Sequence, residues 1–240
     1  MEYALDHKEF RTPKGHPVSM LLRVGTSDHN TLYSALNEDE YGLAGHNLSG
    51  RAADIGAHIG SVAVGLLVDN PGLRVVAVEP VPPNVELLRQ NLERNGVSDR
   101  CEVIAAAVGK GRKTVIRYGS IGMDGDTDAE RENATHHAFI GNTALVYPKT
   151  PNRPHDEVTV PVLSVKNLLP LDFMKIDVEG GEWGFLASPH VRELRYIVGE
   201  VHPTNGHAPL HMAAMLGETH DVTFTGPPAG PCGFVAVRRG

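Results

Sequence analysis

The residues at positions 54–60, with the sequence DIGAHIG, have types and a spacing that suit the binding of a small ligand. They follow one apolar stretch and lead into another, so we expect a buried strand, a tight turn and a helix. Glycine at positions 56 and 60 leaves room for a ligand to approach the backbone. The carboxylate of Asp54 suits a ligand that carries positive charge better than an anionic one.

The glycine spacing separates this turn from the dinucleotide-binding turn GxGxxG. That motif needs a second glycine two residues after the first, and here Ala57 and His58 fill the space between the glycines. S-adenosylmethionine (SAM) carries a sulfonium and an amino acid end in place of a pyrophosphate, which agrees with the acidic Asp54. The turn therefore predicts a SAM site and argues against NAD.

A second carboxylate, Glu79, follows the apolar run at 75–78 and precedes Pro80. At the end of a strand it can accept hydrogen bonds from both hydroxyls of a ribose. Alone, Asp54 and Glu79 would be ordinary polar residues at strand ends. Their placement on consecutive strands of one βαβ unit favours a cofactor site.

Small residues at positions 105–109, among them Ala107, offer a surface on which a flat adenine ring can pack. Close packing of a helix on the sheet would explain the same small residues equally well. We include Ala107 among the expected cofactor contacts.

Acidic residues also end the next predicted strand, in FMKIDVEGGE at 173–182, and are followed by EVH at 200–202. Methyl transfer from a sulfonium is an in-line displacement, so the protein must align the acceptor and remove its proton. His202 or a carboxylate can take the proton directly. Alternatively, Asp177, Glu200 and His202 can hold a divalent ion that acidifies the acceptor. Of these two schemes we favour the one without a metal.

Trp183 comes directly after the acidic strand end, where it can wall a pocket, and Glu182 stands at the start of the next helix. Each has a structural explanation. An acidic group at the start of a helix stabilises the helix N-terminus, and an aromatic residue there often packs in the core.

The elements that must position these residues alternate between short apolar runs and amphipathic stretches, a pattern typical of parallel strands joined by crossover helices. The chain fits one domain, with residues 1–50 as an N-terminal cap and a polar insertion at 119–157 as a substrate loop. In the cap we expect a short strand or turn segment at 18–24 and a helix at 31–43. The expected strands after it are 51–55, 73–78, 101–108, 173–178, 196–201, 222–225 and 234–238, and the expected helices are 61–69, 83–95, 182–188 and 207–216.

Composition narrows the class of protein. The 240 residues include 41% hydrophobic residues, enough for a substantial core. A net charge of −7 and the lack of a Lys/Arg run argue against nucleic acid as a partner. No apolar stretch approaches the roughly 20 residues that span a bilayer, and no secretory signal is visible, so we expect a cytoplasmic protein with no membrane partner. Two separated cysteines make a structural zinc site or a disulfide framework improbable.

These motifs together resemble the FkbM family of SAM-dependent methyltransferases, through DIGAHIG, VEP with the following Asn91 and Asn95, KIDVEGGE and EVH. The resemblance covers about residues 26 to 202, and KIDVEGGE is its most specific part. It implies a Rossmann-like α/β class I methyltransferase, with a seven-stranded, mostly parallel sheet whose last strand is antiparallel and with helices on both faces. His58 departs from the asparagine usual in the family, although histidine can also donate a hydrogen bond.

The resemblance implies O-methylation, with Asp177, Glu179 and Glu182 beside the methyl-transfer site. The family's Gly-x-Ser-Leu-like stretch corresponds loosely to residues 141–145, which adds Asn142 as a substrate contact. The expected cofactor contacts are Asp54, Gly56, Ala57, His58, Gly60, Glu79, Pro80, Ala107, Asp177 and Glu179; the expected substrate contacts are Asn142, Glu182 and Trp183; the expected catalytic residues are Asp177, Glu200 and His202.

We therefore expect a methyltransferase that acts on a hydroxyl of a small molecule, such as a secondary metabolite or a sugar. The strand ending at 178 is followed by VEGG and not by the Asn/Asp-Pro-Pro-Tyr/Phe run with which methyltransferases clamp a planar nitrogen. An N- or carboxyl-methyltransferase of the same fold remains the alternative, as does a nucleotide-binding protein without catalysis. The oligomeric state stays open, with a homodimer as one option.

Overall fold

A seven-stranded sheet forms the centre of the computed structural model, which describes residues 4–109, 111–118, 139–140, 156–178, 180–203, 207–226 and 232–240. The strand order is β12-β13-β11-β10-β3-β4-β5, and β11, β10, β3, β4 and β5 are mutually parallel. Strand β13 runs antiparallel to both of its neighbours, which confirms the expected fold class. The strands are β3 (Gly50–Ile55), β4 (Leu73–Val78), β5 (Cys101–Ile104), β10 (Phe173–Ile176), β11 (Tyr196–Val201), β12 (His220–Thr225) and β13 (Cys232–Arg238).

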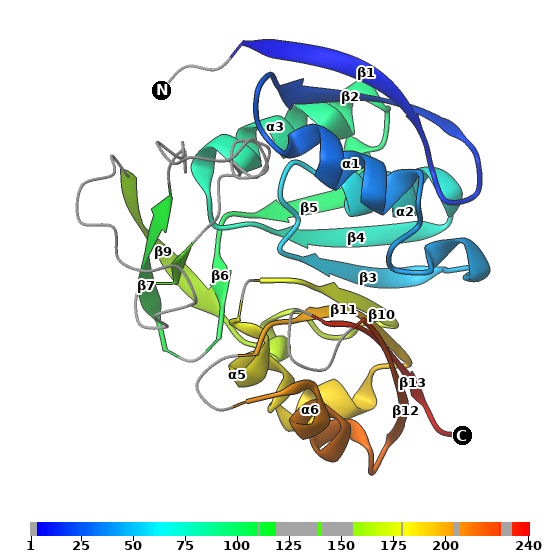
Figure 1. The fold of residues 1–240 in the computed structure, drawn as a ribbon, viewed down its shortest axis with the longest axis vertical. Coiled ribbons are helices and arrows are strands. Elements are labelled where there is room, and N and C mark those ends of the chain that lie inside the picture. Colours follow the sequence, from blue (N-terminus) through cyan, green and yellow to red (C-terminus); the bar gives the residue numbers. More distant parts are fainter. Residues whose placement is uncertain are drawn as a thin grey trace.

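Helices cover both faces of this sheet, as Figure 1 shows. Neighbouring strand residues point to opposite faces, so Ala52 packs with one cluster of buried side chains and Ala53 with the other. Burial on both faces explains why these strands appear in the sequence as nearly continuous apolar runs. The first cluster includes residues of α1 (Asp28–Leu36), α2 (Ser61–Asp69) and α3 (Pro82–Arg94), and the second includes residues of α5 (Glu182–Leu186) and α6 (Pro209–Leu216).

The N-terminal segment is a β-hairpin, β1 (Leu5–Arg11) and β2 (Pro17–Arg23), which packs against α3. The side chains of Asn91 on α3 and of Asn95 just after its end bond to the backbone of Leu21 and Ser19, respectively, at distances of 2.6–3.1 Å. The segment expected at 18–24 as a strand or a turn is the second strand of this hairpin, and the first strand was not predicted.

The helix expected at 31–43 is observed as α1, which begins and ends earlier. Its end has a local cause at Asp39, which adopts a left-handed backbone conformation with φ of 53°. The Asp39 carboxylate accepts hydrogen bonds from the backbone N–H groups of Leu43 and Ala44, and so starts a short 3₁₀ helix there. Short 3₁₀ helices occur at Leu43–Gly45, Ser98–Arg100, Val165–Asn167 and Pro189–Glu193.

The structure has a second, smaller sheet, and the expectation of one strand at 101–108 is wrong because this stretch contributes to both sheets. Strand β5 ends at Ile104, and Ala107–Val108 form β6, which pairs with β9 (Asp156–Leu163) in this other sheet. Its order is β6-β9-β7-β8, with β7 (Lys113–Tyr118) and β8 (Phe139–Ile140). The insertion expected at 119–157 falls between β7 and β9. Apart from β8 and the start of β9 it lies outside the described residues, so its role as a substrate loop stays a prediction.

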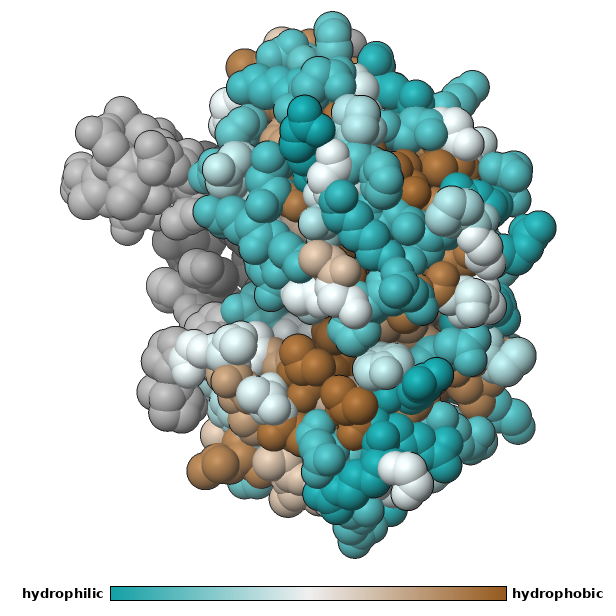
Figure 2. All heavy atoms as spheres, turned by 90° about the vertical axis from the view of Figure 1, so that its right-hand side faces the viewer, coloured by the Kyte–Doolittle hydropathy of each residue, from teal (hydrophilic) through white to brown (hydrophobic). Residues whose placement is uncertain are grey.

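Exposed apolar side chains are dispersed over the described surface. Figure 2 shows a predominantly hydrophilic face with hydrophobic residues in separate groups, as is normal for a globular protein. Within the described ranges, no helix has the length and apolar character needed to cross a membrane. The large exposed hydrophobic residues are Leu5, Val24, Tyr33, Val115, Leu210 and Val237.

Candidate active site

The turn between β3 and α2 has the tight backbone that its glycines predicted. Gly56 has φ of 78° and Gly60 has φ of 98°, a region that L side chains rarely adopt. The N–H groups of Gly56 and Ala57 both donate to the carbonyl of Val78, at 2.9 and 3.1 Å. These bonds join the turn to the end of β4, where Glu79 follows.

Glu79 sits against this turn and is 4% exposed. Its carboxylate accepts hydrogen bonds from the backbone N–H groups of His58 and Val81, each at 3.0 Å, and from Nδ2 of Asn84 at 3.2 Å. Burial raises the pKa of Glu79, and these hydrogen bonds oppose that rise. Among the described residues, the buried Oδ1 of Asn84 has no hydrogen-bond partner. A carboxylate beside an unsatisfied amide oxygen fits a ligand with hydroxyl donors, such as a ribose.

Asp54 is entirely buried, and its nearest charged partner is Lys175 of β10, with Nζ 3.5 Å from Oδ1. Lys175 also donates a hydrogen bond of 2.8 Å to the carbonyl of Gly56. Burial raises the pKa of Asp54, which Lys175 partly offsets. For Lys175, burial opposes the charge, but nearby carboxylates led by Asp54 outweigh it and raise the pKa. The lysine therefore stays charged and ties Asp54 to the backbone of the turn.

The N-terminal hairpin reaches the turn through His58, whose backbone is also left-handed, with φ of 49°. Its Nε2 lies 3.3 Å from Nη2 of Arg23 and 3.6 Å from Oδ1 of Asp28. Arg23 and Asp28 are both buried and form a two-pronged ion pair, with both N–O distances at 2.8 Å. This network was not predictable from the sequence, because its members come from segments with no shared motif.

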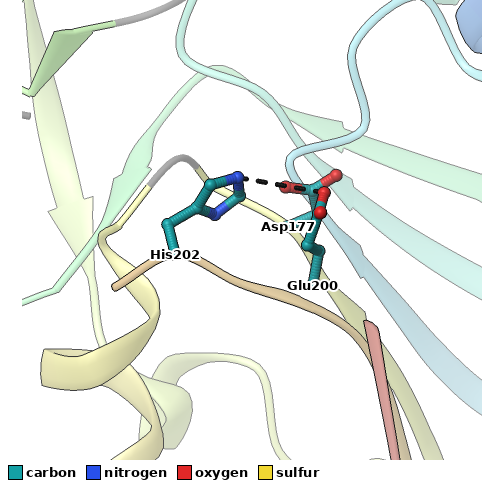
Figure 3. Close-up of side chains that lie close together, drawn as sticks. All are labelled: Asp177, Glu200 and His202. Carbon is teal, nitrogen blue, oxygen red and sulfur yellow. Dashed lines mark ion pairs between the residues drawn. The ribbon is translucent and has the colours of Figure 1, made fainter. Parts of the chain in front are cut away.

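A second group of side chains gathers where β10 and β11 end. Ligand-type atoms of Asp177, Glu200 and His202 all lie within 4.8 Å of one another, and each residue is half-buried. Figure 3 shows the two carboxylates together, facing the imidazole. Because β10 and β11 are parallel neighbours, their carboxyl ends meet at one edge of the sheet. The structure thus brings together the three residues expected to be catalytic.

Two further side chains hold this group from outside it. Glu182 is entirely buried, and its Oε1 lies 3.0 Å from Nδ1 of His202 while accepting N–H bonds from Val178 and Gly180. The hydroxyl of Tyr41 donates to Oδ2 of Asp177 at 3.1 Å. Burial, reinforced by Asp177, raises the pKa of Tyr41 well above its usual value, so the hydroxyl keeps its proton.

The other expected site residues have mixed surroundings. Ala107 is buried in the core of the smaller sheet with Ile116, which differs from the helix packing given as the alternative, and its contact with adenine stays a prediction. Trp183 is 6% exposed, and its Nε1 donates a bond of 2.7 Å to the carbonyl of His202. Ala57 is buried and Pro80 is half-buried beside Glu79. The expected contacts Glu179 and Asn142 lie outside the described residues.

Sequence reasoning placed Glu182 against the substrate, whereas the structure places it behind His202. Reasoning from strand ends also missed Asn84 and Lys175 as parts of the site. The sequence offered a signal for Lys175, since a lysine inside an apolar strand next to an acidic strand end needs a buried partner. For Asn84 the signal was weaker, namely an amide in the first turn of the helix after Glu79.

Comparison with known proteins gives a family match. The model of the methyltransferase FkbM domain matches residues 54–224, well over half of the chain. That range includes the turn, Glu79 and the group at the ends of β10 and β11. No curated protein matches the sequence.

Solved structures of similar architecture include two precorrin methyltransferases and one protein in complex with S-adenosylhomocysteine. Precorrin-6y C5,15-methyltransferase from Geobacter metallireducens has a TM-score of 0.45 and 15% identity, over 81% of this chain and 82% of that one. The C-terminal domain of the precorrin-6Y enzyme from Rhodobacter capsulatus has a TM-score of 0.44 and 13% identity, over 82% and 84%. TrmK from M. capricolum, solved with S-adenosylhomocysteine, has a TM-score of 0.43 and 12% identity, over 80% of this chain but only 63% of its own.

Proposed function

Because this chain belongs to the FkbM family of methyltransferases, we propose that it transfers the methyl group of SAM to a hydroxyl oxygen of a small molecule. The observation that carries the proposal is the convergence of Asp177, Glu200 and His202 at the strand ends next to the glycine turn. A site that methylates a hydroxyl must remove a proton from a poor acid, and this group supplies the means.

In this proposal the residues at the carboxyl ends of β3 and β4 bind the cofactor. Glu79 and Asn84 accept hydrogen bonds from the ribose hydroxyls, while Gly56 and Gly60 leave room for the cofactor to pass the backbone. Asp54 is entirely buried, and its pair with Lys175, which also donates to the carbonyl of Gly56, holds the turn in place for the cofactor. SAM supplies the electrophilic methyl group when bound.

The acceptor lies at the ends of β10 and β11 in this proposal. Its oxygen attacks the methyl carbon in line with the sulfur, so that an O–C bond forms while the S–C bond breaks and S-adenosylhomocysteine leaves. The acceptor proton departs through the group of Asp177, Glu200 and His202. A neutral amine is nucleophilic enough to attack before it loses a proton, whereas a hydroxyl becomes a good nucleophile only as its proton leaves, so such a group favours oxygen.

Methyl transfer from labelled SAM to panels of hydroxyl, amine and carboxyl acceptors tests the acceptor class. The variant Asp177→Asn should slow transfer by at least about 100-fold while changing SAM affinity by less than about threefold. Asp221→Asn is the matched control, because Asp221 is exposed and pairs with Arg239 far from the site. Labelling confined to amines, or an equal loss of SAM affinity and transfer in Asp177→Asn, would overturn the assignment.

A further inference from the structure

We propose that Asp177, Glu200 and His202 bind a divalent cation of the Mg²⁺ or Mn²⁺ type, and that this ion activates the acceptor hydroxyl. The sequence had favoured removal of the proton without a metal. The inference depends on the proposed function for its catalytic meaning, whereas the binding of the ion is separate from it.

The spacing of the three side chains suits a single ion. Metal–ligand bonds of about 2.1 Å place neighbouring ligand atoms about 3 Å apart and opposite ones about 4.2 Å apart. The ligand atoms here lie within 4.8 Å of one another, so small side-chain rotations bring all three onto one ion. Nε2 of His202 lies 3.8 Å from Oε2 of Glu200, too far for a hydrogen bond and close to the separation of two ligands.

The charge of the group also suits a divalent ion. Asp177 and Glu200 bring two carboxylates close together at a half-buried position, where their mutual repulsion is costly. A doubly charged cation balances both. The buried Lys175 interacts with Asp177 as well as with Asp54, and its ammonium donates to the carbonyl of Gly56.

An independent feature, Glu182, points to a metal ligand at His202. Histidines that bind metals usually donate their other ring N–H to a carboxylate, which fixes the tautomer and the ring orientation. Glu182 lies outside the group, is entirely buried and accepts at Nδ1 of His202. This bond leaves the lone pair on Nε2, the nitrogen that faces Glu200 in Figure 3. Asp177 is steadied in a similar way by Tyr41.

The chemistry of the ligands indicates the kind of ion and its role. Two carboxylates suit Mg²⁺ and Mn²⁺, and the single imidazole favours Mn²⁺ of the two, whereas structural zinc sites are rich in thiolates. Three protein ligands leave coordination positions for the acceptor oxygen and for water. An ion held there would acidify the acceptor hydroxyl, whose proton would pass to solvent, so the three residues would act through the ion and not directly as bases.

Titration of the EDTA-treated, dialysed full chain with Mn²⁺, followed by electron paramagnetic resonance without SAM or acceptor, tests the site. We expect binding of one ion, weakened at least tenfold in His202→Asn and about 10- to 100-fold in Glu182→Gln. Glu193→Gln is the matched control, since the exposed Glu193 also contacts Nδ1 of a histidine, His190, at 3.2 Å. Its affinity should equal that of the unmodified chain.

Absence of Mn²⁺ binding to the unmodified chain, or equal affinity in all variants, would overturn the inference. Thermal melting of each variant separates loss of the ion from loss of the fold. Mn²⁺ binding without any methyl transfer would support the metal site and contradict the proposed function. Methyl transfer that persists in EDTA, together with no Mn²⁺ binding, would support the proposed function and contradict the metal site.

Discussion

Gly56 lies directly against the backbone carbonyl of Asp177, so closely that a Cβ at Gly56 would overlap the carbonyl oxygen. The contact is reinforced by the N–H of Asp177, which donates to the carbonyl of Ile55 at 3.0 Å. Two motifs that are far apart in the sequence therefore share one backbone junction. This junction sets how the cofactor turn and the methyl-transfer group lie relative to each other.

The variant Gly56→Ala should lower the free energy of unfolding by about 2–4 kcal/mol, because alanine suffers both the overlap and a φ of 78°. Urea unfolding followed by circular dichroism measures the change. Gly72→Ala is the matched control, since nothing lies within 4 Å of a Cβ at that position. Equal stability of the two variants would contradict the close packing at the junction.

The buried pair of Arg23 and Asp28 predicts a dependence on pH. Burial alone would raise the pKa of Asp28, but Arg23 and His58 outweigh it and hold the pKa below its ordinary value of 3.8. A lowered pKa in the folded state means that the stabilisation is complete above about pH 4 and is lost as pH falls through that lowered pKa.

Accordingly, Asp28→Asn should cost about 3–5 kcal/mol at pH 7, since Arg23 would keep a buried charge without its partner. The difference from the unmodified chain should shrink below pH 3.8. Urea unfolding at a series of pH values measures both effects, with the exposed Asp221→Asn as control. A difference that is constant from pH 7 to pH 2.5 would be inconsistent with the assigned pair.

Cys101 should resist alkylation in the folded protein. Burial, with a contribution from Asp54, raises the pKa of its thiol to about 12. At pH 8 the reactive thiolate is then about one part in ten thousand, so iodoacetamide should react at least about 100-fold more slowly than with a free cysteine. Mass spectrometry of the folded and urea-unfolded chain measures this. Alkylation of the folded chain at the unfolded rate would refute it.

Elements that are buried on both faces could be predicted closely from the sequence. Strands β4 and β11 and helix α2 begin and end at the residues expected, because full burial demands apolar runs with polar or glycine ends. The prediction of a single strand at 101–108 was wrong for a related reason. Apolar residues fit either sheet equally well, so the pattern cannot show that Ala107 and Val108 leave the main sheet for β9.

The residues of the site were predictable where topology alone decides their place. Asp177 and Glu200 follow or end parallel strands, and such ends meet at one edge of the sheet. The partners of these residues were not predictable, because they depend on packing between distant segments. Tyr41 reaches Asp177 from the N-terminal segment, and Glu182 turns inward to His202 instead of outward to a substrate.

Calorimetric titration with SAM, and separately with NAD, tests the central claim that the glycine turn and Glu79 form a SAM site. We expect micromolar SAM binding, no NAD binding, and at least about tenfold weaker SAM binding in Glu79→Ala, which loses a charged acceptor of hydroxyl hydrogen bonds. The control variant is Glu93→Ala, because Glu93 is exposed on α3, the helix that follows Glu79. It should bind SAM as the unmodified chain does. Failure of the unmodified chain to bind SAM, or equal SAM affinity in Glu79→Ala and Glu93→Ala, would contradict the account.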